Sequence, residues 1–122
     1  MRLGIDLLPL GALDRLCDRA WFTRYAFAAA EIEYATTLAP GRRREFLAGR
    51  FAAKEAVFKV LGTGLFEGVA PSEIVVARAP GGAPQVTLAG AAARMAAQAG
   101  VSGLTVSITH SDDMVAAVAA GW

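Results

Sequence analysis

The sequence has one cysteine, Cys17, and one histidine, His110, among its 122 residues. A single cysteine excludes a disulfide scaffold and a cysteine-based zinc site, and a single histidine excludes a histidine-cluster metal site. No run approaches the roughly 18–20 apolar residues that cross a bilayer. Asp6 also interrupts the N-terminal stretch where a signal peptide needs its apolar centre. We expect one cytoplasmic domain spanning residues 1–122, with no membrane partner.

Apolar spacing and turn residues predict an α+β fold. Helices are expected over residues 12–20, 28–37, 42–61 and 89–99. Strands are expected over residues 2–8, 74–77, 85–88, 104–109 and 114–120. The longest helix, which ends before Gly62, carries the strongest signal. The predicted architecture is a small, mainly antiparallel sheet that is closed by the first strand and packs against a long central helix.

Basic residues gather in the long helix, although the whole chain has a net charge of only +1. Residues 42–59 carry six basic and two acidic side chains, a local net charge of +4. Such a helix favours a phosphate-bearing ligand or an acidic partner, and a solvated helix face explains it equally well. RNA binding through Arg42, Arg43 and Arg44 is a weaker alternative, because no aromatic residues lie among them to stack bases. We therefore expect no nucleic acid partner.

Two carboxylates occupy positions next to apolar residues. Asp6 lies within the short apolar strand, where an unpaired carboxylate is costly to bury, and Glu55 lies at the edge of the helix's apolar stripe. Two such acids suit Mg²⁺, which binds one or two carboxylates together with substrate phosphates, and Lys59 would contact the same phosphates. The alternatives are an ordinary Glu55–Lys59 pair one turn apart and pairing or capping by Asp6. Taken alone, His110 and the Gly62–Gly64 segment are explained as structural elements.

Residues 50–64, with the sequence RFAAKEAVFKVLGTG, resemble the signature of the holo-acyl-carrier-protein synthase type of 4′-phosphopantetheinyl transferase. Residues 4–6 are similar to the Gly-Ile-Asp strand of this family, and residues 106–111 to its Ser-x-Ser-His-Thr segment. Residues 82–84 resemble its Gly-x-Pro turn, and residues 27–31 its Phe-Thr-x-x-Glu element. The resemblance covers essentially the whole chain, and its Phe-Ala-Ala-Lys-Glu-Ala core is highly specific.

The resemblance implies transfer of the 4′-phosphopantetheine arm of coenzyme A to a serine of an acyl or peptidyl carrier protein, with release of adenosine 3′,5′-bisphosphate. It implies that Asp6 and Glu55 hold Mg²⁺ and that Lys59 contacts the phosphate under attack. The proton acceptor would be Glu55, or a water that Glu55 orients at the metal. The implied coenzyme A contacts are Arg50, Lys59, Gly62, Gly82, Pro84, His110 and Ser111. The implied carrier-protein contacts are Arg15, Arg19 and Arg24.

The chain is half as long as the two-domain members of the family, in which two similar halves form one site. The resemblance therefore implies a homotrimer with sites at the subunit interfaces. The chain departs from the family at Pro9, which replaces an acid, at Ala28, which replaces a helix-capping threonine, and in having a single glycine before Asp6.

A non-catalytic module that binds coenzyme A or a carrier protein is the alternative of a different class. Loss of Asp6, Glu55 or Lys59 would have favoured it, and all three are present. The sequence leaves open whether the carrier serves fatty-acid, polyketide or another natural-product synthesis. It also leaves open the choice between Mg²⁺ and Mn²⁺ and the acceptance of acyl-coenzyme A.

Overall fold

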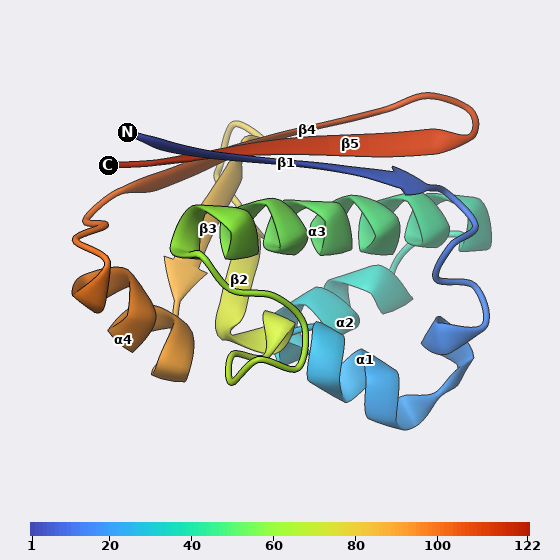
Figure 1. Cartoon of the computed structure of the whole chain (residues 1–122). Coiled ribbons are helices and arrows are strands. Elements are labelled where there is room, and N and C mark those ends of the chain that lie inside the picture. The colour runs from blue at the N-terminus through green and yellow to red at the C-terminus, as the bar shows by residue number, and fades with distance from the viewer.

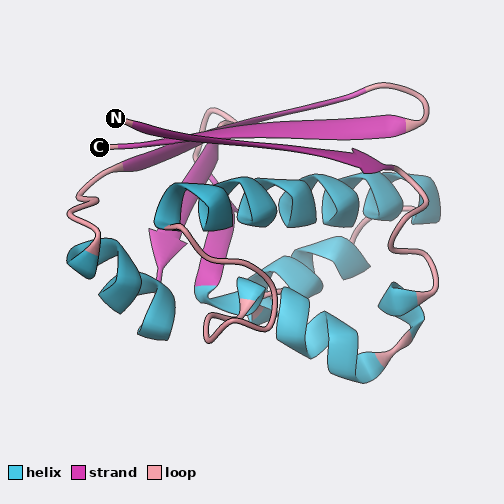
Figure 2. Cartoon of the chain, in the orientation of Figure 1, coloured by secondary structure: helices cyan, strands magenta, loops and turns pink.

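The computed structural model describes residues 1–122 and places one long helix between a sheet and several shorter helices (Figures 1 and 2). Its elements are β1 (Arg2–Pro9), the 3₁₀ helix η1 (Leu16–Asp18), α1 (Ala20–Ala26), α2 (Ala29–Thr36), α3 (Pro40–Leu61), the 3₁₀ helix η2 (Pro71–Glu73), β2 (Ile74–Arg78), β3 (Pro84–Leu88), α4 (Gly90–Gln98), β4 (Leu104–His110) and β5 (Met114–Gly121). None of the helices combines the length and hydropathy that a membrane span requires.

A three-stranded antiparallel sheet covers one side of α3, in the order β1-β5-β4. Figure 1 shows this sheet above α3, with α1 and α2 below the helix. β2 and β3 form a separate antiparallel pair. The predicted α+β class, the β4–β5 hairpin and closure of the sheet by the first strand are confirmed, with the strands divided between two sheets.

The long helix α3 confirms the strongest prediction from the sequence. It begins at Pro40, two residues before the predicted start, because a proline in the first turn has no N–H that the helix would need to satisfy. It ends at Gly62, whose φ of 79° is left-handed and favours glycine. Every other predicted element except the helix over residues 12–20 lies within one residue of its expected bounds.

Alanine side chains allow the sheet to approach α3 closely. Ala52 and Ala56 on α3 and Ala117 and Ala119 on β5 are buried in the same apolar cluster. Because a methyl group takes little room, the backbones of helix and sheet pack at short range. The alanine-rich composition therefore determines how near α3 can place its polar side chains to β1.

The predicted helix over residues 12–20 is wrong. This segment forms turns and η1, and a regular helix begins only with α1. Leu13 is buried in a second apolar cluster, whereas Leu16 is exposed, so the apolar spacing does not describe one helix face. The Asp14 carboxylate also accepts two hydrogen bonds from Arg44 on α3 (2.9 and 2.7 Å). This long-range pairing and the burial of Leu13 determine the local conformation in place of helix propensity.

Candidate functional site

Asp6, Glu55 and Lys59 lie together where β1 crosses α3. The Asp6 side chain is 17% exposed, and its Oδ1 lies 3.5 Å from Nζ of Lys59. Lys59 also donates a hydrogen bond to the carbonyl oxygen of Ile5 (2.5 Å). Glu55 lies one helical turn before Lys59, close enough to Asp6 for their charges to interact. The structure thus brings together the three residues that the resemblance assigns to the metal and the phosphate under attack.

The electrostatics of this cluster are compatible with a bound cation. Burial raises the pKa of Asp6, and Lys59 offsets part of that rise. Burial likewise raises the pKa of Glu55, the Asp6 carboxylate raises it further, and Lys59 lowers it in part. Oε1 of Glu55 is buried and has no hydrogen-bond partner. Because buried acceptors normally have a partner, this atom beside a second carboxylate fits a hard, oxygen-preferring cation such as Mg²⁺.

The cluster would supply only part of a metal's coordination sphere. No group of three or more histidine, cysteine, aspartate or glutamate side chains is arranged to hold a metal ion. Mg²⁺ commonly takes one or two protein carboxylates and fills its other positions with water and substrate phosphates. Two carboxylates therefore fit a cation that is shared with a phosphate-bearing ligand.

Gly4 lies two residues before Asp6 on β1 and allows α3 to approach the strand closely. A Cβ atom added at Gly4 would lie 1.9 Å from the carbonyl oxygen of Ala56 and 3.1 Å from Cβ of Lys59. Gly4 and Asp6 point to the same face of β1, since side chains alternate along a strand. The Gly-Ile-Asp sequence therefore combines a close helix–strand contact with a carboxylate directed at that helix.

We expect Gly4→Ala to lower the stability of the fold, because β1 and α3 must separate to accommodate the new methyl group. The loss should be about 1–3 kcal/mol, the usual cost of overpacking, and thermal unfolding measures it. Gly41→Ala is the matched control, because a Cβ there meets no atom within 4 Å. It should leave stability unchanged or raise it by up to about 1 kcal/mol. Equal melting temperatures for the two variants would contradict the role of Gly4.

A second group of predicted site residues lines a hollow beside β4, on another face of α3. The hollow has a volume of ≈ 240 Å³ and contains Arg50, Gly82, Pro84 and His110 in its wall. At about 100° per residue, Arg50 and Glu55 point in directions roughly 140° apart around α3. β1 and β4 are also the opposite edge strands of the three-stranded sheet. The predicted site residues therefore form two groups on different flanks of one chain.

Several residues in the wall of the hollow are not among the coenzyme A contacts that the resemblance implies. These residues include Tyr34, Arg42, Glu45 and Arg78. The only acid in the wall, Glu45, lies near the only histidine, with 3.9 Å between its Oε2 and Nε2 of His110. Three arginines and a histidine against one carboxylate suit an anionic ligand. Tyr34 and Arg78 come from separate elements, α2 and β2, so their spacing in the sequence carries no signal of this meeting.

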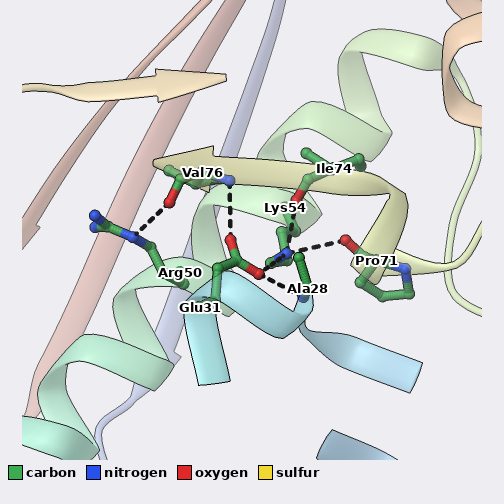
Figure 3. Close-up of polar contacts among 7 residues, drawn as sticks. All are labelled: Ala28, Glu31, Arg50, Lys54, Pro71, Ile74 and Val76. Atoms are coloured by element: carbon green, nitrogen blue, oxygen red, sulfur yellow. Dashed lines mark hydrogen bonds and ion pairs between the residues drawn. The ribbon is translucent and has the colours of Figure 1, made fainter. Parts of the chain in front are cut away.

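Arg50 is held in place by its neighbours. Its Nε donates a hydrogen bond to the carbonyl oxygen of Val76 (3.1 Å), and its guanidinium carbon lies 4.6 Å from the centre of the Phe46 ring. Figure 3 shows its terminal nitrogens pointing away from the buried polar cluster behind it. Burial lowers the pKa of Arg50, Glu31 raises it in part, and Arg78 lowers it further. An arginine fixed in this way can offer its terminal nitrogens to a phosphate.

A buried ion pair behind Arg50 ties α2, α3 and β2 together (Figure 3). Lys54 is fully buried, and its Nζ lies 2.6 Å from Oε1 of Glu31. Burial lowers the pKa of Lys54, and Glu31 offsets part of that change. Lys54 also donates hydrogen bonds to the carbonyl oxygens of Pro71 (3.0 Å) and Ile74 (2.6 Å). The Glu31 carboxylate also accepts hydrogen bonds from the backbone N–H groups of Ala28 (2.8 Å) and Val76 (2.9 Å). Because every partner is satisfied, the pair fixes the rotation of α3 and hence the direction of Glu55.

The pair also compensates for the alanine at the start of α2. Ala28 cannot cap the helix with a side chain, but its backbone N–H donates to Glu31 as in half of a capping box. In the Phe27–Glu31 element, Glu31 therefore both caps the start of α2 and pairs with Lys54. The burial of Lys54 had no signal in the sequence, since lysines are seldom fully buried.

Besides Lys59, two predicted coenzyme A contacts lie outside the hollow. Gly62 ends α3 three residues after Lys59, on the side of the first group. Ser111 lies in the turn after β4, where its hydroxyl is 3.3 Å from Oδ1 of Asp113. The three predicted carrier-protein contacts, Arg15, Arg19 and Arg24, are exposed on η1 and α1 or at their first turns.

The three consecutive arginines at the start of α3 point to different partners. Arg42 lines the hollow. Arg43 donates to the carbonyl oxygens of Ala35 in α2 (2.9 Å) and of Leu38 after it (3.0 Å), and Arg44 pairs with Asp14. They do not form one basic surface, which removes the structural basis for RNA binding through all three.

Comparisons with known proteins agree with this geometry. The profile of the 4′-phosphopantetheinyl transferase superfamily matches residues 2–119. A holo-[acyl-carrier-protein] synthase of Maridesulfovibrio salexigens is 40% identical over 119 residues, covering 95% of this chain and 93% of the relative. Another, of Desulforudis audaxviator, is 49% identical over 117 residues, covering 96% and 88%. The crystal structure of a holo-(acyl-carrier-protein) synthase from Bacillus anthracis in complex with CoA (3′,5′-ADP) is similar with a TM-score of 0.81 and 29% identity, covering 98% and 94%.

Proposed function

Since the chain belongs to the 4′-phosphopantetheinyl transferase superfamily, we propose that it is a holo-acyl-carrier-protein synthase. It transfers the 4′-phosphopantetheine arm of coenzyme A to a serine of a carrier protein and releases adenosine 3′,5′-bisphosphate. The observation that carries this proposal is the meeting of Asp6, Glu55 and Lys59 at the crossing of β1 and α3. Residues 1–122 would form one transferase domain, and the lone thiol of Cys17 favours a cytoplasmic location.

Asp6 and Glu55 are proposed to hold Mg²⁺ against the pyrophosphate of coenzyme A. When bound, Mg²⁺ neutralises phosphate charge and favours attack on phosphorus. Lys59, positioned by the Ile5 carbonyl oxygen, is placed to donate to the phosphate under attack. Glu55 is the candidate acceptor for the serine proton, because its raised pKa makes it a better base than an exposed glutamate.

The hollow beside β4 is proposed to receive the phosphates of the nucleotide part of coenzyme A. Arg50 and His110 would pair with phosphate oxygens, and Arg42 and Arg78 add positive charge to the same wall. The remaining proposed contacts to coenzyme A are Lys59, Gly62, Gly82, Pro84 and Ser111. Gly62 and Ser111 would contact coenzyme A from outside the hollow. Gly62 lies near Lys59, and Ser111 follows His110.

A homotrimer would join the first group, which is Asp6, Glu55 and Lys59, to the hollow beside β4 of a neighbouring protomer and so form complete sites. The Asp6 group of one protomer would face the His110 hollow of the next, and this head-to-tail contact closes a ring of three equivalent sites. Separation of the two groups on opposite edges of the sheet supports this arrangement.

The outer face of the sheet gives the proposed trimer an apolar surface to bury. Leu3, Ile5 and Leu7 alternate along β1 and are 67%, 66% and 65% exposed. They pair in register with Ala120, Val118 and Ala116 on β5. Large side chains exposed in a contiguous row are typical of a protein interface. Sedimentation velocity should therefore give the mass of three chains.

Carrier-protein mass measures the proposed reaction directly. The protein would be incubated with coenzyme A, Mg²⁺ and a panel of apo carriers from fatty-acid and natural-product pathways. Each carrier accepted should gain one phosphopantetheine arm, and EDTA should prevent the gain. A folded protein that binds coenzyme A but modifies no carrier would support the non-catalytic module. Parallel reactions with Mn²⁺ and acyl-coenzyme A measure metal and donor preference.

Reversing the charge of Arg19 should weaken carrier binding, because carrier proteins of this class present an acidic helix and Arg19 is exposed at the start of α1. We expect Arg19→Glu, or Arg15→Glu, to raise the KM for the carrier by about ten-fold and to leave the KM for coenzyme A unchanged. Arg94→Glu is the matched control, since Arg94 is exposed on α4 at the other end of the molecule (Figure 1). Equal effects of Arg19→Glu and Arg94→Glu would show that net charge alone matters.

A further inference from the structure

Lys59 pairs with only one of the two carboxylates beside it. Its Nζ lies 3.5 Å from Oδ1 of Asp6 and also donates to the carbonyl oxygen of Ile5. Glu55 lies one helical turn before Lys59, the favourable order for an ion pair along a helix, yet the two side chains form none. Lys59 therefore acts across the crossing of α3 and β1, while Oε1 of Glu55 is left without a partner.

The ammonium group of Lys59 contacts the kinds of oxygen atom that a hard cation binds. Carboxylate and backbone carbonyl oxygens are both common ligands of such cations. A divalent cation held by Asp6 and Glu55 would therefore compete with Lys59 for the Asp6 carboxylate, and the ammonium charge would repel it. Burial raises the pKa of both carboxyl groups, and Lys59 lowers it in part at each of them. The position of Lys59 thus decides how much negative charge the two carboxylates offer to a cation.

Lys59 is free to leave Asp6, in contrast to the other lysine of α3. The Lys59 side chain is 51% exposed and ends a flexible four-carbon stem. Lys54 is fully buried, and its ammonium group is held by Glu31 and by the carbonyl oxygens of Pro71 and Ile74. A phosphate offers an ammonium group a charge-assisted hydrogen bond, which is stronger than a bond to a neutral carbonyl. A phosphate placed beside Lys59 would therefore draw its ammonium group away from Asp6.

We propose that Lys59 couples the binding of a divalent cation to the binding of coenzyme A. While Lys59 pairs with Asp6, it weakens cation binding at Asp6 and Glu55. When Lys59 turns to a phosphate of coenzyme A, both carboxylates become available to the cation. Such coupling is reciprocal, so each ligand tightens the binding of the other by the same factor. The inference rests on the proposed function, because it takes the cation and the phosphates from that reaction, and it adds to any coupling that direct contact between cation and phosphate provides.

Binding of Mn²⁺ without coenzyme A tests the competition directly, with unbound Mn²⁺ measured by electron paramagnetic resonance. Lys59→Met should bind Mn²⁺ about ten-fold more tightly than the wild type, because a positive charge next to the cation has been removed. Lys59→Gln should behave in the same way, and Lys59→Arg, which keeps the charge, should bind Mn²⁺ no more tightly than the wild type. Arg94→Met is the matched control, because it removes an exposed positive charge on α4 and should leave the affinity unchanged. Binding by Lys59→Met and Lys59→Gln that is equal to or weaker than that of the wild type would overturn the inference.

The effect of coenzyme A on Mn²⁺ affinity measures the coupling itself, once titrations without protein have corrected for Mn²⁺ bound by coenzyme A alone. Coenzyme A should tighten Mn²⁺ binding to the wild type by a factor about ten-fold larger than in Lys59→Met, because the charge that moves in the wild type is already absent from the variant. Equal factors in the two proteins, with a wild type that modifies a carrier, would overturn the coupling role of Lys59 and leave the proposed function standing. If Asp6→Asn binds Mn²⁺ as tightly as the wild type, the proposed metal site fails. If the wild type modifies no carrier, the proposed function itself fails.

Discussion

Glu55→Gln should abolish phosphopantetheine transfer and at the same time stabilise the protein at neutral pH when no metal is added. Transfer should fall by about 10³-fold, because glutamine removes a negative metal ligand and the candidate proton acceptor together. The melting temperature should rise by about 2–4 °C, because the buried Oε1 then belongs to a neutral amide. Loss of activity with a gain in stability distinguishes a functional carboxylate from a structural one.

The gain in stability has a defined pH dependence. Burial and Asp6 raise the pKa of Glu55 in the folded state above its unfolded value. Ionisation of Glu55 therefore opposes folding above the folded pKa, and this cost disappears as the pH falls below the unfolded pKa of about 4.3. The difference in melting temperature between Glu55→Gln and the wild type should be largest near pH 7 and should shrink towards about pH 4.

Metal binding provides a second readout that does not depend on turnover. Mg²⁺ with coenzyme A should raise the melting temperature of the wild type more than that of Glu55→Gln. Asp6→Asn should behave in the same way, and Glu33→Gln, on the exposed side of α2, should behave like the wild type. Full transfer activity in Glu55→Gln would remove the argument for a metal site at the crossing of β1 and α3.

Mixing two inactive variants should restore activity if each site takes residues from two protomers. Glu55→Gln impairs the first group and Arg50→Gln impairs the hollow, so neither homotrimer contains an intact site. In a randomly mixed trimer, about one interface in four joins an intact first group to an intact hollow. Co-expression followed by purification should therefore give about a quarter of wild-type activity.

The matched control combines two variants that impair the same group. A mixed trimer of Asp6→Asn and Glu55→Gln places one of the two defects in every site, so it should stay inactive. Recovery in this control would show contamination by wild-type protein. No recovery with Arg50→Gln, from trimers shown by mass to contain both chains, would mean that the two groups do not meet across an interface.

Local features were predictable because they depend on neighbouring residues. The spacing of apolar side chains and Gly62 defined α3, and alternation with a short turn defined the β4–β5 hairpin. The helix expected over residues 12–20 failed because Asp14 pairs with Arg44 across the fold. Such long-range pairing is invisible in a short stretch of sequence.

Some residues of the candidate site could likewise be predicted from the sequence, and others could not. Asp6, Glu55 and Lys59 could be chosen from the resemblance, and the structure brings them together. Arg78 could not be chosen, because it enters the hollow only through the pairing of β2 with β3. Lys54 was also missed, since its role depends on complete burial against Glu31.

The alternation of side chains along β1 has a consequence for how this protein can vary. One face of the strand carries Gly4 and Asp6, and the other carries Leu3, Ile5 and Leu7. A slip of one residue in the pairing with β5 would turn the carboxylate outward and an aliphatic side chain towards α3. In the proposed trimer, one short strand therefore encodes both subunit recognition and chemistry, so inserting or deleting a single residue there would disable the two properties together.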